Sequence, residues 1–75
     1  MNKLVLFVDA EGLVRWHLVT RNGRIILGCT QGYHDKLTMI KSLLMVKFVQ
    51  NFNIVDKDDL FKQGYLKHLK SILVI

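Results

Sequence analysis

The feature that most constrains the fold is an Asn22-Gly23 pair that separates two segments with the pattern of β-strands. Asn-Gly tolerates positive φ at both central positions of a type I′ turn, so the pair predicts a tight hairpin. The first segment, Leu13 to Thr20, alternates apolar and polar residues with a period of two, as a strand with one buried face does. The second segment returns from Arg24 to Cys29. We therefore predict an antiparallel hairpin with Trp16 on its buried face.

Two further elements complete the predicted unit. Residues Lys3 to Val8 are rich in strand formers and end at an acidic turn that contains a glycine. From Lys36 to Gln50 apolar residues recur at helical spacing, and Asp35 precedes them as a helix N-cap. The sequence thus predicts an α+β fold in which a three-stranded antiparallel β-meander is followed by a packing helix. The predicted core residues are Trp16, Leu18, Ile40, Leu44 and Phe48.

Residues 51–75 are predicted to be a C-terminal helical extension that packs on the same domain. The acidic run Asp56 to Asp59 is typical of a helix start, where the positive end of the helix dipole favours carboxylates. A second helical segment is therefore expected between Lys57 and Lys70. Gly64 weakens this helix, which leaves two shorter pieces as an alternative. The apolar end, Ile72 to Ile75, is predicted to form a short final strand or a packed end.

An ordered set of residues carries a family resemblance. The set consists of Gly12, Arg15-Trp16-His17-Leu18, Asn22-Gly23-Arg24-Ile25-Ile26, Gly32-Tyr33 and Lys36. This order resembles the YegP-like family of small uncharacterised proteins, and the resemblance places the family's unit at residues 1–50. It implies a β-β-β-α unit that occurs as a tandem pair or as a single copy that dimerises, and it implies no enzymatic reaction. One copy is expected here, because residues 51–75 hold no second Trp or Asn-Gly pair.

The size of the chain favours self-association. A domain near 75 residues buries only about 60% of the surface that its unfolded chain exposes. Cys29 is the single cysteine, so no disulfide within the chain adds stability, and oligomerisation is the remaining aid. We predict a homodimer in which the sheets or the Lys36–Gln50 helices meet. The predicted interface residues are Tyr33, Met39, Leu43, Ile72, Leu73, Val74 and Ile75.

The basic charge of the chain supports an alternative function. The net charge is +5, and residues 12–50 hold six basic residues against one acid. The sheet face opposite Trp16 is therefore predicted to be basic and able to meet nucleic-acid phosphates. Solvation and protection of the sheet edges against pairing explain the same charges without a ligand. The residues predicted for this basic face are Arg15, His17, Arg21 and Arg24.

The residues that carry chemistry form no catalytic or metal-binding pattern. The three histidines are far apart, and Asp56–Asp59 lacks the glycine and terminal glutamate of a calcium loop. Cys29 is interpreted as a structural thiol, and His34 beside Asp35 is an acid/base pair only if a cleft closes over it. The apolar segment Leu37–Val49 is interrupted by lysines, so no membrane-spanning helix is expected.

The predicted function is a small, cytoplasmic, homodimeric protein-interaction module that binds and modulates a partner protein. It is expected to be no enzyme and to need no cofactor or metal. A nucleic-acid-binding protein that uses the basic sheet face is the alternative.

Overall fold

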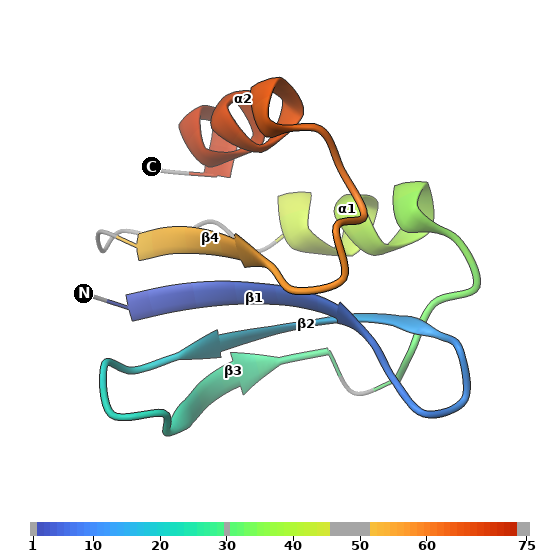
Figure 1. Cartoon of the computed structure of the whole chain (residues 1–75), viewed down its shortest axis with the longest axis horizontal. Helices are drawn as coiled ribbons and strands as arrows, with labels where there is room; N and C mark the ends of the chain where they lie inside the picture. Colours follow the sequence, from blue (N-terminus) through green and yellow to red (C-terminus); the bar gives the residue numbers. More distant parts are fainter. Residues whose placement is uncertain (1, 30, 46–51, 74–75) are drawn as a thin grey trace.

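The computed structural model describes residues 2–29, 31–45 and 52–73. Its elements, in chain order, are β1 (Asn2–Val8), β2 (Val14–Val19), β3 (Ile25–Gly28), α1 (Lys36–Leu44), β4 (Phe52–Asp56) and α2 (Gln63–Leu73). The strands form one sheet with the order β3-β2-β1-β4 (Figure 1). β2 is antiparallel to β1 and β3, whereas β1 and β4 run parallel. The α+β class and the first three strands are confirmed, but the sheet is mixed and has a fourth strand.

The fourth strand corrects the prediction for residues 51–75. β4 pairs with β1 over five positions, from Asn2↔Phe52 to Leu6↔Asp56. Residues on both sides of position 50 therefore share one sheet, and the C-terminal part is not purely helical. The second helix, α2, begins at Gln63 and not near Lys57, because the acidic run holds a loop between β4 and α2. Two alternatives were predicted for Ile72 to Ile75: the final strand is wrong at Ile72 and Leu73, which belong to α2, whereas the packed end is confirmed at Leu73, which lies in the core.

Both helices lie on one face of the sheet, where they bury its apolar side chains (Figure 1). This confirms Trp16, Leu18 and Ile40 as core residues. Leu44 is 40% exposed, because it is the last residue of α1 and lies beside the buried stripe of the helix. Phe48 lies outside the described residues. The core consists of Leu4, Leu6, Val14, Trp16, Leu18, Met39, Ile40, Leu43, Phe52, Leu66, Leu69 and Leu73.

The start of α1 is confirmed. Asp35 has an extended backbone, and its Oδ1 accepts the Thr38 N–H at 2.8 Å. The Thr38 hydroxyl donates to the same carboxylate, so the cap holds a backbone group and a side chain together. α1 ends at Leu44 with Met45 as its C-cap. The rest of the helix predicted to run to Gln50 lies outside the described residues.

The two hairpins turn in the same way. Gly12 and Gly23 have φ values of +81° and +88°, and each donates its N–H to the carbonyl three residues earlier. The Thr20 N–H also donates to the Arg24 carbonyl at 2.8 Å, which closes a three-residue loop with its glycine in the left-handed region. Asn22 does not have positive φ, so the type I′ prediction is wrong. Glycine alone supplies the conformation that the Asn-Gly pair was expected to share.

Candidate interaction surface

One face of the sheet is covered by helices, and the described residues leave the opposite face uncovered. We call the latter the open face. Its apolar side chains come from three neighbouring strand pairs, in which Val5 lies opposite His17 and Val55, and Val19 lies opposite Ile25. Ile25 is 56% exposed and Val55 is 38% exposed. A depression of about 380 Å³ lies on this face. It is lined by Val5, Phe7, His17, Val19, Gly23, Ile25 and Lys57.

His17 occupies the middle of the open face. Its ring centroid lies 4.9 Å from that of Phe7 on β1. On the other side is Gly28 of β3, where an added Cβ would lie only 2.6 Å from His17 Cδ2. Glycine at this position therefore leaves the space that the imidazole fills. Partial burial and, less strongly, the charge of Arg15 lower the pKa of His17, which keeps the ring neutral at physiological pH.

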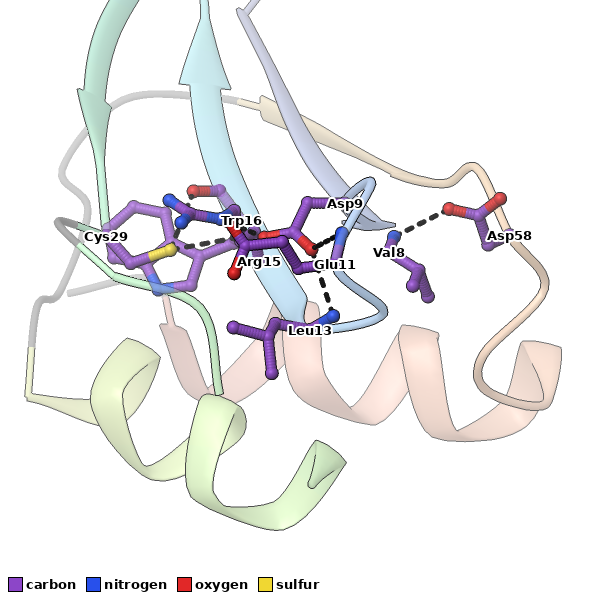
Figure 2. Close-up of polar contacts among 8 residues, drawn as sticks. All are labelled: Val8, Asp9, Glu11, Leu13, Arg15, Trp16, Cys29 and Asp58. Atoms are coloured by element: carbon purple, nitrogen blue, oxygen red, sulfur yellow. Dashed lines mark hydrogen bonds and ion pairs between the residues drawn. The ribbon is translucent and has the colours of Figure 1, made fainter. Parts of the chain in front are cut away.

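Arg15 shares the open face but is tied to the turn between β1 and β2. Its Nε donates to Asp9 Oδ2 at 2.6 Å, while Asp9 Oδ1 accepts the N–H groups of Glu11 and Leu13 (Figure 2). The hydrogen bond from Arg15 is the main cause of the lowered pKa of Asp9, and the same bond raises the pKa of Arg15. The positive charge of Arg15 is thus neutralised within its own chain.

The structure brings the predicted basic face together only in part. Arg15 and His17 alternate with the buried Trp16, as predicted, but one is ion-paired and the other is a neutral ring. Arg21 is in the loop of the β2–β3 hairpin, Arg24 ends that loop, and both are exposed. The centre of the open face is therefore apolar, and free cations lie at its margins. Sequence reasoning missed this because it weighed the charged residues of β2 without the apolar residues of β1 beside them.

The predicted interface residues fall in different places. Met39, Leu43 and Leu73 have no exposed surface, because they pack inside the core of a single chain, so they cannot contact a second copy in this fold. Tyr33 is half-buried, and its backbone N–H and C=O both pair with Val14. Ile72 is exposed on α2. Val74 and Ile75 lie outside the described residues.

The acidic run after β4 has a structural role. The Asp56 carboxylate accepts the N–H groups of Leu60 and Phe61 at 2.8 and 2.7 Å. Asp58 Oδ2 accepts the Val8 N–H at 2.6 Å, which fastens the loop to the end of β1 (Figure 2). The Asp56 carboxylate thus satisfies backbone donors of the loop, and the Asp58 carboxylate satisfies one at the end of β1.

A second hollow, of about 500 Å³, lies beside the start of α2, but its main groups contact one another. Lys36 Nζ donates to the Leu60 carbonyl at 3.0 Å and lies 5.5 Å from the centroid of Phe61. The Phe61 ring in turn stacks on Tyr65. These contacts hold α1, the loop and α2 together, so the open face is the stronger candidate for a binding surface.

The remaining polar candidates do not assemble a reactive site. Cys29 is half-buried, and its Sγ accepts the Trp16 N–H at 3.4 Å, in accord with a structural thiol. His34 and Asp35 are both exposed, and the Asp35 carboxylate is engaged by Thr38. Within residues 2–29, 31–45 and 52–73, no three His, Cys, Asp or Glu side chains lie close enough to hold a metal ion. The helices in these ranges are too short or too polar to cross a membrane.

Comparison of the chain with known protein families, curated proteins and solved structures finds no match to any of them. The resemblance to the YegP-like family therefore stays a prediction. The order β1-β2-β3-α1 is the order of elements that this resemblance implies.

Proposed function

We propose that this protein is a homodimeric protein-interaction module whose two copies meet through the open face. The observation that carries the proposal is the apolar character of that face on all four strands. β1 contains the uninterrupted apolar run Leu4 to Val8, of which Leu4 and Leu6 are buried and Val5 and Phe7 point to the open face. Strands with continuous apolar runs are typical of sheets covered on both sides. A second copy supplies the missing cover.

The dimensions of the sheet suit such a contact. Four strands about 4.8 Å apart, with about six residues of roughly 3.3 Å each, give a footprint of roughly 400 Å² per copy. Both copies together give about 800 Å² of flat footprint, close to the roughly 1,000 Å² that a specific interface should clear. The same patch occurs on both copies, so it meets itself across a two-fold axis.

The electrostatics of the open face also favour self-contact. A neutral His17 and an ion-paired Arg15 leave no unbalanced charge at the centre of the interface. Lys3 and Lys57 are exposed, and their long side chains keep their ammonium groups in water at the margin. Nucleic-acid binding draws less support, because an apolar centre does not attract phosphates. The exposed Arg21 and Arg24 are the residues that would serve it.

Light scattering at low micromolar concentration tests the proposal. The wild type is expected at twice the 8.7 kDa mass of the chain. Phe7→Asp places a charge in the contact, so we expect a folded monomer whose circular dichroism is unchanged. Leu37→Asp is the matched control, because Leu37 is an exposed apolar residue on the helical side, and this variant is expected to stay dimeric. A monomeric wild type, or dissociation by Leu37→Asp alone, overturns the proposal. Salt-sensitive binding to nucleic acid by a monomer favours the alternative.

A further inference from the structure

A groove separate from the open face runs between β4 and α2. Its volume is about 220 Å³. β4 is the last strand in the sheet order, so no strand of the described chain pairs with its outer edge. The residues that line the groove are Asn53, Ile54, Gln63, Leu66, Lys67 and Lys70.

The backbone of β4 offers hydrogen bonds on the outer side of the sheet. The Lys57 N–H donates to the Leu6 carbonyl at 2.9 Å, which sets the direction of the alternating backbone groups. In a parallel ladder the backbone groups of Val55 then face β1, and those of Ile54 face away from it. The N–H and C=O of Ile54 are therefore directed to the outer edge, where an extended segment can pair with them.

The side chains of the groove select the chemistry of such a segment. Ile54 is half-buried and Leu66 is buried, so they form an apolar floor. Lys67 and Lys70 are exposed, and a spacing of three places them as neighbours on the surface of α2. None of the residues that line the groove is acidic. An extended occupant complements this arrangement if it carries carboxylates two residues before and two residues after an apolar side chain, because residues at this spacing point to the same face of a strand.

We propose that the β4 edge and this groove bind an extended acidic segment of a partner protein. The segment adds as a further strand beside β4 and pairs with the backbone of Ile54. One apolar side chain of the segment covers Ile54 and Leu66, while its carboxylates meet Lys67 and Lys70. The site uses the edge of the sheet and α2, so it does not depend on contact between two open faces.

Amide chemical shifts of the intact protein test the proposal, with a short capped peptide that repeats Glu-Thr-Val-Thr as the probe, because this repeat puts glutamate and valine on the same face of a strand. We expect the largest shifts at Asn53, Ile54 and the Lys67–Lys70 turn, and we expect protection of the Ile54 amide from hydrogen exchange. A peptide that repeats Lys-Thr-Val-Thr is expected not to bind. Shifts confined to the open face or to the β2–β3 hairpin overturn the proposal.

Two charge-reversal variants distinguish peptide binding in the groove from non-specific attraction of an acidic peptide to a basic protein. Lys67→Glu with Lys70→Glu is expected to weaken peptide binding by roughly ten-fold or more. Arg21→Glu with Arg24→Glu changes the net charge equally at the hairpin, and it is expected to leave the affinity within about two-fold. Equal loss in both variants contradicts the groove. Light scattering on the same samples reports the dimer independently, so failure of one proposal is distinguishable from failure of the other.

Discussion

The two faces of the sheet are built from the same strands but have different surroundings. On the helical face, Leu4, Leu6 and Trp16 are almost completely buried by α1 and α2. On the open face, Val5 and Phe7 alternate with them yet stay partly exposed. An antiparallel sheet with one solvated face normally places polar residues there. This sheet differs, because both of its faces carry apolar side chains and the helices of one chain cover only one face.

The largest expected effect comes from a substitution on the helical face of the sheet. Trp16 packs in the core, and its Nε1 donates to Ser42 Oγ at 3.1 Å. Trp16→Ala is expected to cost about 3–5 kcal/mol, which unfolds a domain of this size. Phe7→Ala removes an aromatic ring from the open face and is expected to cost less than about 1.5 kcal/mol in the monomer. Urea unfolding measures both, and equal costs contradict the assignment of the buried face.

A second, smaller effect comes from the space beside His17. Gly28→Ala brings a methyl group against the imidazole, so we expect a loss of about 1–2 kcal/mol through overpacking. Shortening the neighbour by His17→Ala removes the clash, and the double variant is expected to lose less than the sum of the two single losses. Urea unfolding of the four chains gives this coupling. Strict additivity shows that the imidazole does not lie against position 28.

Acid is expected to weaken the proposed contact between open faces. The pKa of His17 is lowered below its usual 6.5 by burial and by Arg15, so the unfolded chain binds the proton more readily than the folded one. Stability from this group is present above pH 6.5 and is lost as the pH falls through the folded pKa. The nearby Arg15 opposes an imidazolium at the same place. Light scattering from pH 7.5 downward is expected to show dissociation, and His17→Gln is expected to abolish that dependence. Dissociation that persists in His17→Gln assigns it to another group.

The smallest effect belongs to the turn that carries Arg15. The pKa of Asp9 is lowered from 3.8, chiefly by the hydrogen bond from Arg15. The contribution of this carboxylate to the free energy of unfolding is therefore present above pH 3.8 and is lost as the pH falls through the folded pKa. Asp9→Asn is expected to lower the melting temperature only slightly, because the Arg15–Asp9 pair stays partly exposed to water and such ion pairs contribute little. The variant is also expected to flatten the acid limb of stability below pH 3.8. A large loss of stability at neutral pH contradicts this expectation and shows that the turn is needed to position β1 against β2.

Local signals account for the parts of the fold that the sequence predicts correctly. The alternation around Trp16 and the cap at Asp35 are both confirmed. Each depends only on neighbouring residues, so the sequence is sufficient to predict it. β4 depends on parallel pairing with a strand far away in the chain, and its five residues carry no local mark of that pairing. Its acidic end resembled a helix start because carboxylates satisfy backbone N–H groups in both settings.

The candidate surface was harder to predict than the fold. The apolar stripe of α1 was recognised, but Met39 and Leu43 were assigned to a second copy because β4, which enlarges the core of one chain, was not foreseen. Gly28 gave the available signal for the open face, since a glycine inside a strand often marks a close approach. The partner of that close approach, His17, follows only from the register of β2 and β3.

The parallel pairing of β1 with β4 also determines when the molecule can fold during its synthesis. Val8 and Asp58, which are 50 positions apart, are joined by a hydrogen bond of 2.6 Å. While a ribosome is still making the chain, the hairpins of β1, β2 and β3 can form, but the outer edge of β1 stays unpaired until β4 has been synthesised. Phe52 enters the core with β4, and Leu66 and Leu69 of α2 enter it later still. The nascent chain therefore exposes the open face, and the part of the helical face that α2 covers, until α2 has left the exit tunnel, and this is the interval in which a chaperone has apolar strands to bind.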